Sequence, residues 1–144
     1  MKIITGFEAK ILSDGSIDCP KEFAEKHFLV ASFHTKYEDK KVWMNALRGA
    51  VTNPDVDVIG HLAPEATFDL DPDELEGLAR LIVENGKIVE LNAKYHRPPE
   101  PWVRTFRKCG VRFHLGSDAH SIAEVGNFQK ISDLMSIVND GNGT

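Results

Sequence analysis

The chain has 144 residues, of which 42% are hydrophobic and 27% are charged, and its formal net charge is −5. This composition is typical of a globular domain with a hydrophobic core, and the acidic balance argues against nucleic-acid or membrane binding through bulk charge. No apolar run approaches the length of a membrane span, and the N-terminus lacks the layout of a signal peptide.

Strand-like runs and helical patterns alternate along the chain. The predicted elements, in chain order, are strands at residues 2–12 and 17–19, a helix at 20–26, a strand at 28–33, a helix at 38–51, a strand at 56–59, a helix at 71–86, a strand at 87–92, a helix at 98–110, a strand at 111–115 and a helix at 128–139. The first two strands predict a small hairpin.

This alternation predicts an α/β fold with a parallel sheet and right-handed crossovers. An open doubly wound sheet and a βα barrel both satisfy the order, and the polar strand ends described below favour a barrel or a piece of one. We expect one domain over residues 1–140, followed by a flexible tail at 141–144.

Two helices carry clear sequence signatures. In the helix at 38–51, one face collects the apolar residues Val42, Trp43, Ala46, Leu47, Ala50 and Val51. In the next helix, Asp71 can cap the N-terminus and Glu74 can complete a capping box. We expect Trp43 and Trp102 to lie in the core.

The two cysteines do not suggest a metal or disulfide site. Cys19 and Cys109 are far apart, and neither has a CxxC partner. A disulfide framework and a thiolate zinc site are therefore disfavoured, and a reducing cytoplasm is the simplest compartment.

Five polar residues recur at intervals of 26 to 29 residues, each following a strand-like run: Glu8, His34, His61, Glu90 and Asp118. This interval suits one strand plus one return helix, so the five side chains are expected to converge on one rim. Histidine nitrogens and carboxylate oxygens suit Zn²⁺, Mn²⁺ or Fe²⁺, and two histidines with one carboxylate leave positions open for water. The alternative is that each residue is an isolated polar strand terminus.

The sharpest local motif is Gly116-Ser117-Asp118-Ala119-His120. If the strand conformation persists, Asp118 and His120 leave the same side of the chain, and both could bind a metal. The alternative is that Asp118 or Ser117 caps a helix, and the two interpretations are compatible.

Four basic residues follow the strand at 87–92, namely Lys94, His96, Arg97 and Arg104. They could line the same rim and bind a phosphate, or they could form a solvated basic loop. His27 and His114 are expected to be structural.

Five short motifs are Gly6-Phe7-Glu8, Ser32-Phe33-His34, Gly60-His61, Glu90-Leu91-Asn92 and the Gly116–His120 run. Their order and spacing resemble those of the PHP (polymerase and histidinol phosphatase) superfamily. The resemblance extends from Ile3 to about Val138. It implies a distorted, TIM-like βα barrel, here a partial barrel of about five βα units with an N-terminal hairpin. It also implies a metal-dependent phosphoesterase that acts on a phosphorylated small molecule.

The resemblance also implies roles for the strand-end residues. Glu8 resembles a carboxylate that bridges two metals, and His34 and His61 resemble ligands that share one of them. Asp118 resembles a ligand of the other bridged metal, and His120 a ligand of a third. Glu90 and Asn92 resemble a rim pair that supports the site. From the basic run, His96 and Arg97 are candidate supporting or substrate-binding residues, and the donor types predict one or two ions of Zn, Mn or Fe per chain.

The chain departs from the family at its start. The leading strand with His-x-His, and further histidines before the bridging glutamate, are absent from this sequence. A barrel without these strands would expose two sheet edges. We therefore expect a homo-oligomer or a second chain that supplies the missing strands, or else a truncated gene product.

Three functions are consistent with the sequence. The first is hydrolysis of phosphate esters by a metal-activated water. The second is a non-catalytic metal- or phosphate-binding remnant, or a subunit that supports a partner. The third is an amidohydrolase-like barrel, which usually also requires a leading His-x-His.

Overall fold

The structure, a computed structural model, describes residues 1–62 and 68–140. Its strands are β1 (Gly6–Lys10), β2 (Phe28–Ser32), β3 (Val58–Ile59), β4 (Ile88–Asn92) and β5 (Arg112–Gly116). Its helices are α1 (Lys21–Ala24), α2 (Lys40–Thr52), α3 (Pro72–Glu84), α4 (Glu100–Lys108) and α5 (Ser132–Asn139), with 3-10 turns η1 (Ile122–Glu124) and η2 (Gln129–Ile131).

The strands form one sheet in the order β1-β2-β3-β4-β5, and every neighbouring pair is parallel. The predicted alternation of strands and helices around a parallel sheet is therefore confirmed. Because the spatial order equals the chain order, the described sheet has no point where the order reverses, unlike a doubly wound sheet. The strand ends consequently follow one another along a single rim.

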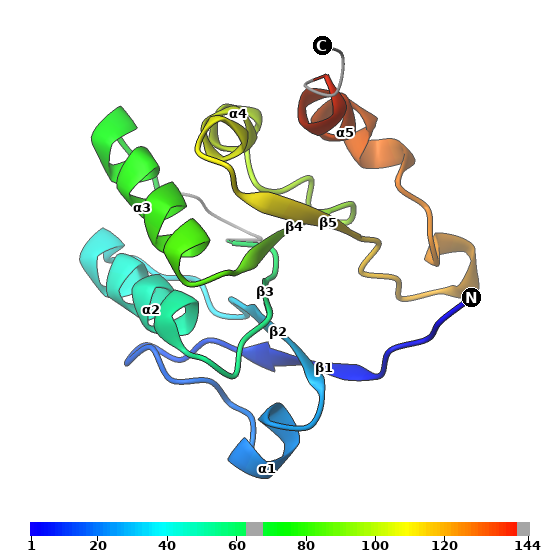
Figure 1. The fold of residues 1–144 in the computed structure, drawn as a ribbon, viewed down its shortest axis with the longest axis horizontal. Coiled ribbons are helices and arrows are strands. Elements are labelled where there is room, and N and C mark those ends of the chain that lie inside the picture. Colours follow the sequence, from blue (N-terminus) through cyan, green and yellow to red (C-terminus); the bar gives the residue numbers. More distant parts are fainter. Residues whose placement is uncertain (63–67, 141–144) are drawn as a thin grey trace.

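Helices cover one face of this curved sheet. Figure 1 shows α2, α3, α4 and α5 in a row along its outer side. Alternate strand residues such as Leu29, Ala31 and Val89 pack into the main hydrophobic cluster together with helix residues, including Trp43. Since side chains alternate along a strand, the residues between them, such as Ser32 and Glu90, point to the opposite face.

The two tryptophans lie in the core, as predicted. Trp43 is 1% exposed and Trp102 is 6% exposed, and their ring centroids are 6.1 Å apart. The predicted apolar face of α2 is correct except at Val42, which is exposed, whereas Met44 is buried. Val42 lies in the first turn of α2, and the neighbouring Trp43 and Met44 form the buried face there.

The α3 capping box is confirmed. The Asp71 carboxylate accepts the backbone N–H of Glu74 at 2.8 Å, and the Glu74 carboxylate accepts that of Asp71 at 3.0 Å. Glu74 also pairs with Lys40 of α2 at 2.6 Å. The start of α3 is thereby fixed relative to the start of α2.

The N-terminal hairpin is reduced to a single antiparallel bridge between Ile11 and Ile17. The first strand is also shorter than predicted, because its pairing with β2 begins only where Gly6 lies opposite Phe28. Near the other end, residues 129–131 form a 3-10 turn, so α5 begins later than predicted. The predicted tail at 141–144 lies outside the described residues. Within the described ranges, no helix is long and apolar enough to cross a membrane.

Candidate metal centre

One pocket collects most of the predicted site residues. Its volume is about 260 Å³, and it is lined by Glu8, Phe33, His34, His61, Tyr95, Asp118 and His120. His34, His61 and Asp118 each lie two residues beyond the end of a strand, so they reach the pocket from β2, β3 and β5. Glu8 and Glu90 were predicted to follow strands. Each is instead the middle residue of a five-residue strand.

Three of these residues form a compact group. The Nε2 atom of His61 lies 3.1 Å from Oε1 of Glu8, and Nε2 of His34 lies 3.5 Å from the same oxygen. One ligand atom from each residue lies within 4.8 Å of the other two. One carboxylate oxygen and two imidazole nitrogens at this spacing form a donor set that suits Zn²⁺, Mn²⁺ or Fe²⁺.

The protonation of Glu8 suits a cation site. The hydrogen bond from His61 lowers the pKa of Glu8 to about 2, although partial burial acts in the opposite direction. Glu8 is therefore ionised at neutral pH. Its contribution to stability is present above its usual pKa and is lost as the pH falls toward about 2.

His61 does not behave as an ordinary core histidine. It is 3% exposed, and its Nδ1 atom is buried without a hydrogen-bond partner in the described part of the chain. Its ring packs against the rings of His34 and Tyr95, with centroids 5.5 Å and 5.0 Å away. Because Nε2 of the ring contacts the Glu8 carboxylate, the ring is oriented toward the cation donor set.

Glu90 and Asn92 form hydrogen bonds to residues that line the pocket. The Glu90 carboxylate accepts the backbone N–H of His61 and the side-chain amide of Asn92, both at 3.0 Å. The same amide donates to the Asp118 carboxylate at 3.1 Å. These bonds connect β4 to the segments that follow β3 and β5. Glu90 therefore positions His61 through its backbone.

Two glycines near the site leave no space for a side chain. A Cβ atom at Gly116 would lie 1.9 Å from Oε1 of Glu90. A Cβ atom at Gly60 would lie 2.1 Å from the Ser32 hydroxyl and 3.4 Å from Glu90. The Glu90 carboxylate therefore requires glycine at position 116, whereas Ser32 and Val30 require it at position 60.

Asp118 and His120 line the pocket differently from the sequence expectation. The strand ends at Gly116, and Asp118 has a φ of +48°, so the extended conformation does not continue to His120. The N-cap of the next turn is Ser121, not Asp118 or Ser117. Neither Asp118 nor His120 belongs to the compact group that surrounds Glu8.

The basic residues separate into different environments. The Lys94 ammonium lies beside His120, at the pocket. His96 pairs with Asp133 of α5, Arg97 donates to the backbone carbonyl of His96, and Arg104 pairs with Glu100 on its own helix.

His114 lies in β5 with its ring directed toward Glu90. Its Nε2 atom is 3.9 Å from Oε1 of Glu90, and burial lowers the pKa of His114. Within the described structure, the Nε2 atom of His114 is buried and has no hydrogen-bond partner.

Two residues at the site were missed by the sequence analysis. Tyr95 packs on His61, and its place just after a strand was the signal that could have identified it. Glu124 accepts the backbone N–H groups of His120 at 2.6 Å and Ser121 at 3.0 Å. Its place three residues after Ser121 is that of a capping-box acid.

The chain is thus an α/β protein, and its candidate cation site lies at the rim of a parallel sheet. No family model matches the chain. It is similar to a protein named "Probable phosphatase" from Acetivibrio thermocellus, with 33% identity over 94% of this chain and 59% of that protein. A protein named as a probable phosphatase in Caldanaerobacter subterraneus is 31% identical over 96% of this chain and 59% of its own length.

A third relative has a different name. The protein named DNA polymerase/3'-5' exonuclease PolX from Bacillus subtilis is 32% identical over 84% of this chain, but the match covers 22% of the polymerase. The chain spans 59% of the length of the two probable phosphatases.

Proposed function

We propose that the chain is a metal-dependent phosphoesterase of the PHP type, with one divalent cation held by Glu8, His34 and His61. The observation that carries this proposal is the approach of three donor atoms to within 4.8 Å in a pocket at the sheet rim. The similarity to proteins named probable phosphatases supplies the reaction class. A divalent cation at this position would supply Lewis-acid charge and an acidified water.

The residues of the chain would prepare the pocket for a phosphate ester. Glu8, ionised at neutral pH, balances positive charge at the donor set. Glu90 fixes the His61 segment through the backbone N–H, so the imidazole is held in place before any ligand arrives. Lys94 brings an ammonium beside His120, which lines the pocket, and there it can donate to phosphate oxygens.

Metal analysis combined with an activity assay tests this function. We expect purified chain to bind Mn²⁺ stoichiometrically and to hydrolyse a generic aryl phosphate when Mn²⁺ is added. A chelator should remove both properties, and renewed Mn²⁺ should restore them. Stoichiometric metal without turnover would favour the non-catalytic binding module, and protein that binds no divalent cation would contradict the proposed site.

We also propose that the sheet is part of a βα barrel that further strands complete. The strand order follows the chain, the helices lie on one side, and β1 is an outermost strand of the described sheet. Beside this edge, Ile3, Ile4 and Phe7 are exposed. Such an edge tends to pair with another strand, from a second copy or from a separate polypeptide.

The oligomeric state tests the self-association form of this proposal. Light scattering after size exclusion should give a mass above that of one chain at high protein concentration. Phe7→Lys should shift the population toward monomer, because it adds a charge beside the edge. The matched control is Val83→Lys, which changes an exposed apolar residue on α3, far along the chain from β1. A monomer at all concentrations would contradict self-association.

A further inference from the structure

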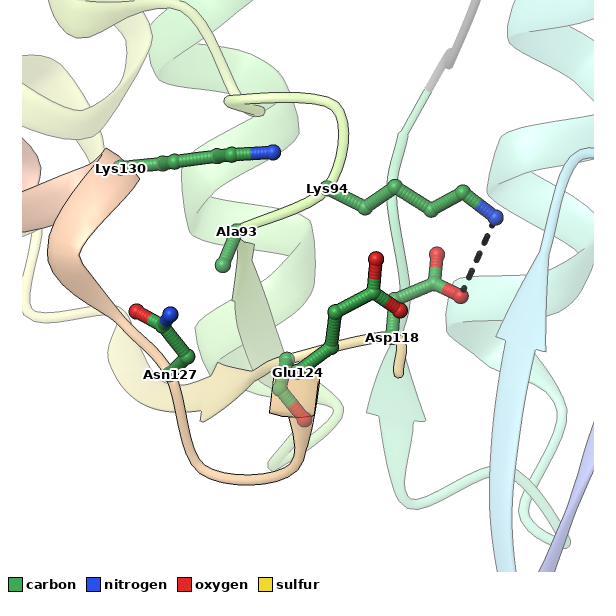
Figure 2. Close-up of a pocket in the computed structure, with 7 residues that line it drawn as sticks. Ala93, Lys94, Asp118, Glu124, Asn127 and Lys130 are labelled. Carbon is green, nitrogen blue, oxygen red and sulfur yellow. Dashed lines mark ion pairs between the residues drawn. The ribbon is translucent and has the colours of Figure 1, made fainter. Parts of the chain in front are cut away.

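The Lys94 ammonium occupies a defined position between charged and polar groups. Its Nζ atom lies 3.0 Å from Nδ1 and 2.9 Å from Nε2 of His120, and 3.9 Å from Oδ1 of Asp118. It also lies 5.3 Å from the centre of the Tyr95 ring. Figure 2 shows the Lys94 side chain extended toward the Asp118 carboxylate, with the ion pair drawn between them.

The backbone of Lys94 is fixed as well. The side-chain oxygen of Asn92 accepts the backbone N–H groups of Lys94 and Tyr95, each at 3.0 Å. The amide nitrogen of the same asparagine donates to Asp118. Asn92 therefore fixes the positions of the Asp118 carboxylate and of the Lys94 backbone. The turn that follows β4 thus holds the two members of the ion pair together.

Asp118 is a largely buried carboxylate beside the Lys94 ammonium. Its side chain is 12% exposed, and a carboxylate with so little contact with water is stabilised only when it is paired or hydrogen-bonded. Oδ2 accepts the Asn92 amide, and Oδ1 lies 3.5 Å from Nδ1 of His120 and 3.9 Å from Nζ of Lys94. The ammonium also lies within 3.0 Å of both ring nitrogens of His120, the atoms through which a metal ion would bind that ring.

We propose that Lys94 stands in for a second metal ion. The chain would then bind one divalent cation, at Glu8, His34 and His61, while the lysine supplies the fixed positive charge on the Asp118 and His120 side of the pocket. A second divalent cation there would meet both the repulsion of the ammonium and the loss of its ligands. This inference rests on the proposed cation site, and on the proposed reaction only for the role of the lysine in binding phosphate.

Metal stoichiometry tests the proposal without any activity measurement. The full chain should bind one Mn²⁺ ion in equilibrium dialysis, with metal counted by plasma mass spectrometry. Lys94→Met should keep this ion and gain a second, weaker one, and Lys94→Met combined with Asp118→Asn should lose the second ion again. Thermal unfolding of each variant establishes that it is folded.

Lys130→Met is the matched control. Lys130 lines the small neighbouring pocket with Lys94 and Asp118, and Figure 2 shows it on the other side of that pocket. This variant should bind one ion, as the unmodified chain does. Two ions in the unmodified chain, or one ion in Lys94→Met, would overturn the role of Lys94 while leaving the proposed cation site intact. No ion in the unmodified chain would overturn both.

Inorganic phosphate gives a second measurement. With one equivalent of Mn²⁺ present, Lys94→Met should bind phosphate at least about 10-fold more weakly than the unmodified chain, because a charge-assisted hydrogen bond is lost. Lys94→Arg should retain most of the affinity. Equal phosphate affinity in Lys94→Met and the unmodified chain would overturn the phosphate-binding role.

Discussion

Replacement of His61 by alanine is expected to abolish phosphate-ester hydrolysis and to weaken Mn²⁺ binding by more than about 100-fold, since even outer groups of metal sites change affinity by about 10–100-fold. His61 supplies one of three donor atoms, and it is the buried member of that group. Its loss leaves Glu8 and His34, which are both substantially exposed. Two exposed ligands cannot hold a cation against water as three do.

The measurement is Mn²⁺ affinity by calorimetry together with turnover of an aryl phosphate. His27→Ala serves as the control, because the His27 ring packs against Phe7, with centroids 5.1 Å apart, and does not line the pocket. This control should keep both the affinity and the turnover. A His61→Ala protein with unchanged Mn²⁺ affinity would show that the cation site lies elsewhere.

Gly116→Ala is expected to weaken Mn²⁺ binding by about 10–100-fold while the protein remains folded. The added methyl group would overlap the Glu90 carboxylate, which must swing away. The backbone N–H of His61 and the amide of Asn92 then lose their acceptor. A buried N–H without a partner costs about 1–3 kcal/mol, so the free energy of unfolding should also fall.

Gly77→Ala is the matched control for this substitution. Gly77 lies within α3, and a Cβ atom there would meet nothing within 4 Å. Alanine at a helix-interior position should raise the free energy of unfolding by about 0.5–1 kcal/mol and leave Mn²⁺ binding unchanged. If Gly116→Ala binds Mn²⁺ as tightly as Gly77→Ala does, then Glu90 does not position His61.

The sequence predicted the larger features of the fold because these features depend on local patterns. The alternation of strands and helices follows from apolar periodicity, and the start of α3 follows from the residue types at Asp71 and Glu74. The spacing of strand-end residues also predicted that Glu8, His34 and His61 would lie close together. Their ligand atoms do lie within 4.8 Å of one another.

Other features depend on contacts between distant segments, which no local pattern encodes. The position of Glu8 in the middle of β1 follows from the register with β2, in which it pairs with Val30. The left-handed backbone at Asp118 and the contact of Lys94 with His120 arise where the turns after β4 and β5 meet. Sequence alone placed His96 and Arg97 with the site, whereas His96 pairs with Asp133 of α5.

The three donor residues come from β1 and from the segments after β2 and β3, so a cation bound to them would cross-link the strand at the sheet edge to the interior of the domain. Edge strands normally open locally, and their amides exchange hydrogen with water without unfolding of the whole protein. With the cation bound, each such opening of β1 would have to release a ligand. Fraying of this edge and loss of the ion would then become a single event, and slow exchange in β1 would report on occupancy of the pocket.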